Sequence, residues 1–283
     1  MEIHSSRTGN QTYEERFCDP KNSFYKLSLE LLHKSGIPFL VGGAYALQHY
    51  TGIYRDTKDL DIFIHAGDHE RVLDIFAEAG FETSLTFTHW LAKAICNGHL
   101  VDIIFNSGNA ISEVDEQWFI HAPEGEIFGV EVRFIPAEEM IWSKGFIMER
   151  ERFDGADVNH ILLACAESLD WERLLARFGP HWRVLFSHIV LFGFVYPSER
   201  GRIPEWVMRD LMDRMEKDSD APPEKLCRGT LISRSQYRVD VTQGGFLDAR
   251  LIPNGKMTKK QVRKWDAGAA IDGAFRRNQP GSG

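Results

Sequence analysis

Two kinds of hydrophobic spacing alternate along the first 136 residues of the chain. Apolar residues three or four apart predict helices over residues 21–34, 43–50 and 68–79. Between and after them, short apolar runs predict strands over residues 37–41, 60–64, 88–96, 100–105 and 130–135. Asn97-Gly98 predicts a hairpin turn between two of these strands. The alternation predicts an α/β fold of the α+β kind, with a mixed sheet.

From Pro136 onward the spacing is helical as far as a polar, proline-containing stretch at 218–223, which we interpret as a linker. The helices are predicted over residues 140–149, 158–167, 171–178, 181–196 and 205–215. After the linker come β-like runs at 229–232 and 237–241 and a helix at 258–265. We therefore divide the chain into a flexible arm (1–20), a sheet-containing core (21–136), a helical domain (137–220) and a small basic α+β appendage with a disordered tail (221–283).

Charge is unevenly distributed over these parts. The net charge of the chain is −8, made of +7 over residues 222–283 and −15 over the residues before them. A basic segment on an acidic body indicates either contact with a polyanion or docking of the basic surface onto the body. Charge alone does not separate these two interpretations.

Composition excludes several classes of protein. No stretch approaches the roughly 18 to 20 apolar residues of a membrane span, and the first residues lack the basic start and apolar stretch of a secretory signal. The cysteines lie far apart without the paired spacing of a zinc site or a disulfide framework: Cys18, Cys96, Cys165 and Cys227. We therefore expect a cytoplasmic protein without a membrane partner.

The most informative residues are two glycines and two aspartates in the core. Gly42 and Gly43 follow an apolar strand, and Asp59 and Asp61 stand one residue apart at the start of the next one. Side chains alternate along a strand, so both carboxylates project from one face, roughly 6.6 Å apart. Such a pair suits one or two hard divalent cations, and glycines before a helix allow the backbone to approach a phosphate. The pattern indicates phosphoryl or nucleotidyl transfer.

A third aspartate, Asp102, is the lone charge of an apolar strand. A strand-buried carboxylate is costly unless it is paired or binds a metal. The predicted hairpin allows this strand to lie beside Asp59 and Asp61. The alternatives are a cap of the hairpin or an ion pair with a nearby Lys or Arg, but the neighbouring motif favours a place in the same site.

With Asp102 the pattern resembles a known superfamily. Gly-Gly, a spacer ending in Arg-x-Thr-Lys, Asp-x-Asp in a strand and a later single strand Asp are typical of nucleotidyltransferases with a polymerase-β-type core. Within that superfamily the chain resembles the minimal branch of aminoglycoside adenylyltransferases, lincosamide adenylyltransferases and AbiEii-type toxins. The resemblance extends over about residues 31–157.

The resemblance implies roles for these residues. Gly42 and Gly43 would hold the phosphates of an NTP such as ATP, and Asp59 and Asp61 would bind Mg²⁺, with two ions expected and Mn²⁺ as an alternative. Asp102 would bind the catalytic metal or act as general base for the acceptor hydroxyl. In-line displacement at the α-phosphate would then release pyrophosphate.

Further cations are candidates for the nucleotide site. The toxin branch commonly has a Lys where this chain has Lys144, followed by basic residues and an Asp. Lys144 would grip the triphosphate, and Asp157 would orient it. Arg55 and Lys58 are candidate phosphate contacts, with neutralisation of the strand aspartates as the alternative. For three further residues of this stretch an exposed salt bridge is the favoured interpretation: Arg150, Arg152 and Asp154.

We therefore predict an enzyme that transfers an NMP from an NTP to a hydroxyl of an acceptor. Three interpretations stay open: a small-molecule adenylyltransferase of the antibiotic type, a tRNA-modifying toxin with an antitoxin partner, and a non-catalytic nucleotide-binding protein. The acidic body favours a cationic small molecule, and the basic tail favours tRNA. The tail cluster is either a nucleic-acid contact or part of a packed module, and we favour the module: Arg228, Arg234, Tyr237, Arg238 and Arg250.

Overall fold

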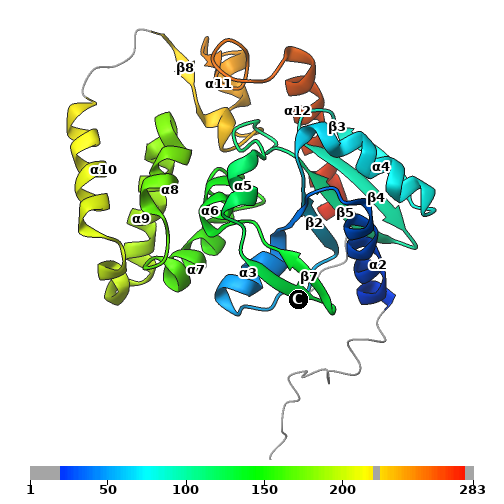
Figure 1. Ribbon diagram of the computed structural model, residues 1–283. Coiled ribbons are helices and arrows are strands. Elements are labelled where there is room, and N and C mark those ends of the chain that lie inside the picture. The colour runs from blue at the N-terminus through cyan, green and yellow to red at the C-terminus, as the bar shows by residue number, and fades with distance from the viewer. Residues whose placement is uncertain (1–19, 219–223, 278–283) are drawn as a thin grey trace, which may run out of the picture.

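The computed structural model describes residues 20–218 and 224–277 (Figure 1). The predicted arm apart from Pro20, most of the predicted linker and the last six residues of the predicted tail lie outside these ranges. Within them, no helix combines the length and the apolar character that crossing a membrane requires. The division into domains stays a prediction.

A five-stranded mixed sheet forms the centre of the first half, as predicted. Its strands lie in the order β1 (Leu40–Val41), β2 (Asp59–Phe63), β5 (His99–Ile104), β4 (Leu91–Cys96) and β3 (Glu82–Phe87). β2 and β5 are parallel, and the other neighbours are antiparallel. Asn97 and Gly98 both have positive φ angles and form the predicted hairpin turn between β4 and β5.

Two strands were not predicted from the sequence because they contain no apolar run. β3 begins with Glu-Thr-Ser and alternates exposed and partly buried residues, and β6 (Glu124–Ile127) has one apolar side chain, Ile127, after Glu-Gly-Glu. β6 pairs with β7 (Val130–Arg133) in a separate hairpin. β1 is also shorter than predicted: only two residues of the run at 37–41 are paired as a strand.

Three helices pack around the sheet: α2 (Pro20–Ser35), α3 (Gly43–Thr51) and α4 (His69–Glu78), the last preceded by a 3-10 turn (Ala66–Asp68). All three were predicted to within one or two residues. On β2 and β5, the buried faces carry Leu60 and Ile62 beside Val101 and Ile103, none of which is exposed to solvent. Burial of these apolar side chains holds the strands in register and sends the intervening aspartates to the opposite face.

A set of helices follows the second hairpin, on the left of Figure 1. It consists of α6 (Ala137–Gly145), α7 (Gly155–Cys165), α8 (Trp171–Phe178), α9 (Trp182–Val195) and α10 (Glu205–Lys217), with 3-10 turns at Gly179–His181 and Pro197–Arg202. The helix predicted at 140–149 is wrong at both ends. It begins directly after Pro136 and stops at Gly145, because residues 147–154 turn back on themselves.

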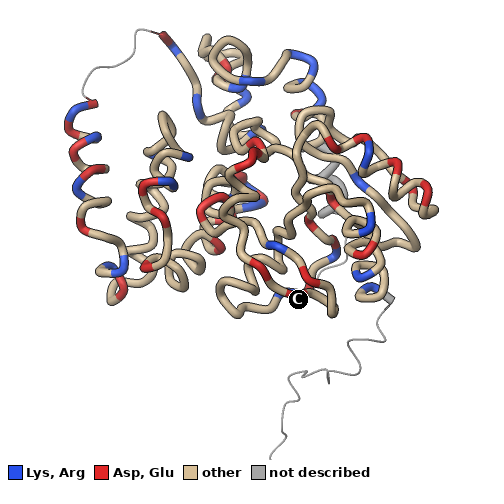
Figure 2. Tube along the Cα trace, in the orientation of Figure 1, with Lys and Arg blue, Asp and Glu red and all other residues tan. Residues whose placement is uncertain are grey.

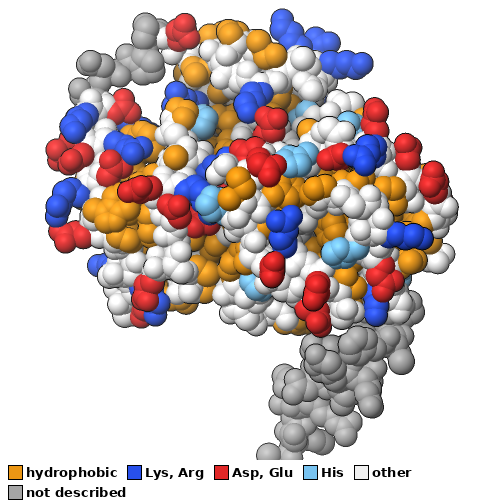
Figure 3. Space-filling view, in the orientation of Figure 1, with side chains coloured by type: hydrophobic (Ala, Val, Ile, Leu, Met, Phe, Trp, Pro, Cys, Tyr) orange, Lys and Arg blue, Asp and Glu red, His pale blue; other side chains and the backbone are white. Residues whose placement is uncertain are grey.

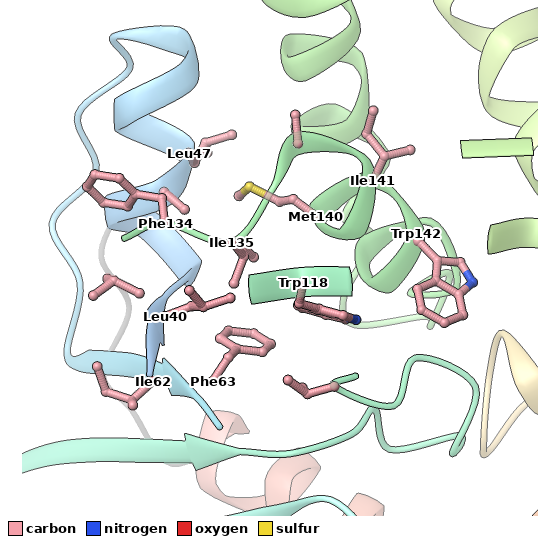
Figure 4. Close-up of a cluster of buried hydrophobic side chains, with 14 of the residues drawn as sticks. Leu40, Leu47, Ile62, Phe63, Trp118, Phe134, Ile135, Met140, Ile141 and Trp142 are labelled. Atoms are coloured by element: carbon pink, nitrogen blue, oxygen red, sulfur yellow. The ribbon is translucent and has the colours of Figure 1, made fainter. Parts of the chain in front are cut away.

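Sheet and helices share a hydrophobic interior (Figure 4). Phe63, at the end of β2, stacks on Trp118 of the short helix α5 (Glu116–Ile120), with ring centroids 5.5 Å apart. Met140 and Ile141 of α6 are fully buried beside it. The chain reaches α6 along the edge of the sheet, where the Ile135 amide donates to the Val41 carbonyl at 3.0 Å. The start of α6 is thus fixed next to the strand that precedes the two glycines.

The C-terminal segment contains little β-structure. The β-like runs predicted at 229–232 and 237–241 are wrong: they form a 3-10 turn (Gly229–Leu231) and α11 (Arg238–Thr242). Such short apolar runs carry no period that separates strand from helix. The segment's strands, β8 (Leu226–Cys227) and β9 (Leu247–Asp248), have two residues each. The predicted helix at 258–265 is confirmed and extends further, as α12 (Lys259–Arg277).

Candidate active site

Three aspartates lie together on one face of the central sheet, which we call the carboxylate face. Asp59 and Asp61 occupy alternate positions of β2, and Asp102 of β5 is the direct register partner of Asp61. The three side chains therefore share one face of two adjacent parallel strands. The strand order places Asp102 beside the other two aspartates, where the sequence led us to expect it. Their catalytic roles stay predictions.

The glycine pair brings backbone directly against this face. Gly42, between β1 and α3, donates its N–H to the Asp61 carbonyl at 2.9 Å. Gly43 has a φ angle of +57°, and a Cβ atom there would lie 1.7 Å from Asp61 Oδ2. Only glycine fits this position, because any side chain would displace the carboxylate. The amides in the first turn of α3 have no side-chain cap, so this helix start beside Asp61 suits an oxyanion.

The crowding and burial of the carboxylates raise the pKa values of Asp61 and Asp102. Burial, together with the nearby negative charges of Asp59 and Asp102, raises the pKa of Asp61 to about 7. Burial also raises the pKa of Asp102, although Lys93 partly offsets this effect. Lys93, on β4, donates to Asp102 Oδ1 at 2.7 Å. Asp61 thus carries a charge that the surrounding protein compensates poorly.

The donor set fits a hard divalent cation in its chemistry. Such ions take carboxylate oxygens, and a cation here would relieve the repulsion that raises the pKa of Asp61. Within the described residues, however, no three Asp, Glu, His or Cys side chains converge as a ready-made metal site. Lys93 holds Asp102, and the Thr57 hydroxyl donates to Asp59 Oδ1 at 2.6 Å. Asp59, Asp61 and Asp102 are the residues that would hold a metal ion.

A second cluster lies where α6 and α7 meet. Lys144, in the last turn of α6, donates to Asp157 Oδ2 at 2.7 Å and to Asp154 Oδ2 at 3.0 Å. Asp157 also accepts a hydrogen bond from Arg55, in the loop that leads to β2. Lys144 lies close enough to the carboxylate face for its charge to lower the pKa of Asp61. The structure therefore brings Lys144, Asp157 and Arg55 together near the aspartates, whereas Lys58 is exposed.

Arg152 and Asp154 are more closely connected to the site than the sequence suggested. Their salt bridge is present, with Arg152 donating to both oxygens of Asp154 at 2.9 and 2.8 Å. Asp154 is buried and shared with Lys144, whereas Arg152 is exposed, so only one partner of the bridge is exposed as we expected. Although burial alone would raise it, the pKa of Asp154 is held below its ordinary value by Arg152 and Lys144. The charge of Arg152 also reaches Asp61 and lowers its pKa.

Lys93 was missed, although the sequence held the signal. A two-residue turn at Asn97-Gly98 fixes the hairpin register, and counting back from it places Lys93 opposite Asp102. The pattern of hydrophobic residues does not distinguish this Lys from any other on the open face of an amphipathic strand. The hairpin register, combined with the candidate role of Asp102, would have identified Lys93.

The basic C-terminal cluster is partly turned inward. Arg250 is 1% exposed and makes ion pairs with Asp248 and Asp266, with N–O distances of 2.7 and 2.6 Å. Arg234 is also buried, with its guanidinium 4.1 Å from the ring centre of Trp265. Figure 2 shows the basic positions of this segment at the top of the molecule. Because these two cations stabilise the packing of the segment itself, the packed-module interpretation fits them better than a nucleic-acid contact.

One comparison defines the chain as a nucleotidyltransferase and gives its family. Residues 22–169, just over half of the chain, match the family described as "Nucleotidyl transferase of unknown function (DUF2204)", so the chain belongs to this family. No curated protein matches the chain. The matched range contains both glycines, the three aspartates and the cluster around Lys144.

Solved structures with similarity to the chain are distant. The antibiotic-resistance factor ANT(2″)-Ia is 20% identical over 59% of this chain and 95% of its own, with a TM-score of 0.43. The lincomycin-bound lincosamide antibiotic adenylyltransferase LnuA is 16% identical over 50% of this chain and 96% of its own, with a TM-score of 0.37. The Megavirus polyadenylate synthase is 15% identical over 60% of this chain and 41% of its own, with a TM-score of 0.37. Similarity at this level assigns no substrate.

Proposed function

We propose that the chain transfers an NMP from an NTP, with ATP as the first candidate, to a hydroxyl group of an acceptor, in a Mg²⁺-dependent reaction that releases pyrophosphate. The observation that carries this proposal is the row of Asp59, Asp61 and Asp102 beside the glycine turn. When bound there, Mg²⁺ or Mn²⁺, as one ion or two, would stabilise the attacking and the leaving oxygens. Asp59 and Asp61 would supply the oxygen ligands, with Asp102 as a third ligand in the alternative in which it does not act as the base.

Asp102 is the proposed general base for the acceptor hydroxyl. Its Oδ1 is bound to Lys93, which leaves Oδ2 to accept the proton. The same ion pair favours the ionised form of Asp102 despite its burial. Lys93 is therefore proposed to keep the base in its working state at neutral pH.

The nucleotide phosphates would lie between the start of α3 and the α6–α7 junction. The amides after Gly42 and Gly43 would contact phosphate oxygens, since no side chain caps them. Lys144 would act as a point charge on the triphosphate, held in position by Asp157. Arg55 is placed by the same Asp157, and we propose that it approaches the phosphates from the opposite loop, with Lys58 as a further contact.

The proposed acceptor is a small molecule, and a tRNA-modifying toxin with an antitoxin partner is the alternative. Of the five residues considered as an alternative nucleic-acid contact, Arg234 and Arg250 are buried. On the face seen in Figure 3, acidic and basic side chains are interspersed, so no single-sign surface for a polyanion is visible there. Against the non-catalytic alternative stands the presence of all three aspartates on one face.

The test is label transfer from each NTP, labelled at the α-phosphate, to a panel of hydroxyl-bearing small molecules and to bulk tRNA. We expect Mg²⁺-dependent labelling of one class of acceptor, and a loss of about three orders of magnitude or more in Asp61→Ala. Undiminished transfer in Asp61→Ala would refute the proposed site. Nucleotide binding without labelling of any acceptor would instead support the non-catalytic alternative.

A further inference from the structure

Between α6 and α7 the chain forms a small hairpin, residues 147–154, which we call the Arg152 hairpin. Met148 and Phe153 form an isolated antiparallel bridge. The Glu149 amide donates to the Arg152 carbonyl at 2.8 Å, and the Asp154 amide donates to the Ile147 carbonyl at 3.0 Å. The few internal hydrogen bonds of so short a hairpin would not hold it in one position by themselves.

The Arg152 hairpin carries a cation to the carboxylate face. Its guanidinium is oriented by two hydrogen bonds to Asp154, which Lys144 also contacts. Through Asp154 and Lys144 this guanidinium is linked to Asp157, which also accepts a hydrogen bond from Arg55 in the loop that leads to β2 and its aspartates. A triphosphate entering beside Asp61 would therefore meet Arg152 as well as Lys144.

The hairpin is held from outside by the C-terminal segment. The Met148 amide donates to the Ile232 carbonyl at 3.1 Å. Arg234 Nε lies 3.1 Å from Glu149 Oε1, and the two side chains are 9% and 22% exposed. An ion pair with so little solvent contact is stronger and less screened than a surface pair.

The C-terminal segment is in turn fixed to the sheet-containing part. Asn109, which follows β5, donates to the Leu231 carbonyl at 2.7 Å. Trp265 of α12 packs edge-on against Phe87 and Trp90, between β3 and β4, with ring centroids 5.0 and 5.1 Å apart. Any side chain at Gly108 would collide with Trp265, because its Cβ would lie 2.3 Å from the ring. Arg234 stacks on the same Trp265, so this ring adds a second connection between the hairpin and the sheet.

We propose that residues 224–268, which lie beyond the range matched to the family, clamp the Arg152 hairpin at the carboxylate face, with Arg234 and Glu149 as positioning residues for Arg152. This inference rests on the proposed function for its effect on activity, but its structural part stands alone. It assigns the C-terminal basic residue Arg234 a role in holding the nucleotide site instead of contacting nucleic acid.

The experiment combines hydrogen exchange with steady-state kinetics on full-length variants. Arg234→Met removes the positive partner of the ion pair with Glu149. If this variant fails to fold, Glu149→Gln removes the negative partner, on the hairpin, instead. Lys256→Met is the matched control, since Lys256 joins the same segment to Glu113 at 3.1 Å through an exposed pair. We expect amide exchange in 147–154 to rise about tenfold in Arg234→Met or Glu149→Gln and to stay unchanged in Lys256→Met.

Kinetics then separate positioning from general stability. Arg234→Met is expected to raise the KM for the NTP about tenfold with a smaller effect on kcat, and Arg234→Lys is expected to restore most of it. In the double variant with Arg152→Gln, the Arg234→Met substitution should raise the KM for the NTP little further, because both substitutions remove the same positioned charge. Hairpin exchange equal to that of Lys256→Met, or full additivity with Arg152→Gln, would overturn the clamp. A wild-type chain that transfers no nucleotide would refute the proposed function, and the exchange data would still decide the clamp.

Discussion

Several unfavourable interactions meet at the carboxyl group of Asp61. It lies two residues from Asp59 and opposite Asp102, a Cβ atom on Gly43 would lie 1.7 Å from its Oδ2, and its pKa is raised from the usual 3.8 to about 7. A carboxyl group in such a place destabilises the fold when it ionises. Strain of this kind is typical of functional sites, where a ligand relieves it.

The pH dependence of stability follows from the direction of this shift. Because Asp61 binds its proton more tightly in the folded than in the unfolded chain, its contribution to the free energy of unfolding falls as pH rises from about 4 to about 7. Asp61→Asn should therefore be more stable than wild type at pH 8, by up to about 4 kcal/mol, and little different at pH 4. Urea denaturation without divalent ions, across this pH range, measures the difference.

The control for this variant is Asp74→Asn, which removes an equal charge from an exposed position on α4. It should not reproduce the effect. A stability difference between Asp61→Asn and wild type that stays constant with pH would contradict the assignment of the raised pKa.

Lys93 is the second residue whose role can be isolated. Lys93→Met removes the partner of Asp102 and leaves burial to raise the pKa of that carboxyl further. If Asp102 works in its ionised form, the acidic limb of the pH–rate profile moves up by about one pH unit, and activity at a fixed pH on that limb falls about tenfold. Lys26→Met, which removes an exposed helical pair with Glu30, serves as control. An acidic limb at the same pH in Lys93→Met would exclude this role.

At the scale of elements, the turn from β1 to α3 decides how close the backbone comes to the carboxylates. Gly43→Ala has two defects: a positive φ angle of +57° and a Cβ that overlaps Asp61 Oδ2. Gly36→Ala is the matched control, because Gly36 has a φ angle of +71° and open space around its Cβ position. Gly36→Ala should cost about 1 kcal/mol of stability and leave activity intact.

Gly43→Ala should cost more stability and lower activity by about two orders of magnitude, because Asp61 must move. Thermal denaturation and the transfer assay measure both quantities. Equal behaviour of the two variants would show that the close approach of Gly43 to Asp61 has no functional weight.

The elements that the sequence predicts are those in which burial of one face imposes a clear hydrophobic pattern. The helices α2, α3 and α4 and the strands β2 and β5 were predicted because one face of each is buried against apolar neighbours. β3 was missed because its polar residues alternate without an apolar run. Lys93 and Arg152 depend on register and on a hairpin held by residues some 80 positions later, and local spacing contains no information about such contacts.

At the scale of the whole molecule, the charge division seen in the sequence has a structural explanation. The segment after residue 222 carries +7, but Arg250 and Arg234 are buried in ion pairs and against an aromatic ring. Arg250 therefore stabilises the packing of the segment itself, and Arg234 pairs with Glu149 of the acidic body. The net charge of −8 that remains opposes the approach of a polyanion.

This arrangement predicts weak binding of RNA. The full chain should not shift bulk tRNA in a native gel, even at about 50 mM salt, where phosphate contacts are strongest. A shift at low salt that disappears near 200 mM would contradict the small-molecule acceptor and favour the toxin alternative. Comparison of the two salt concentrations in one experiment separates phosphate contacts from other binding.

The central claim is that the α-phosphate of an NTP is transferred and that pyrophosphate leaves. It is tested most directly by parallel reactions with ATP labelled at the α- or at the γ-phosphate, in the presence of Mg²⁺ and the responding acceptor. The account predicts label on the acceptor from the α-phosphate alone, one pyrophosphate released for each label transferred, and neither product with Asp61→Ala. Label from the γ-phosphate, or transfer from the α-phosphate that Asp61→Ala leaves intact, would contradict it.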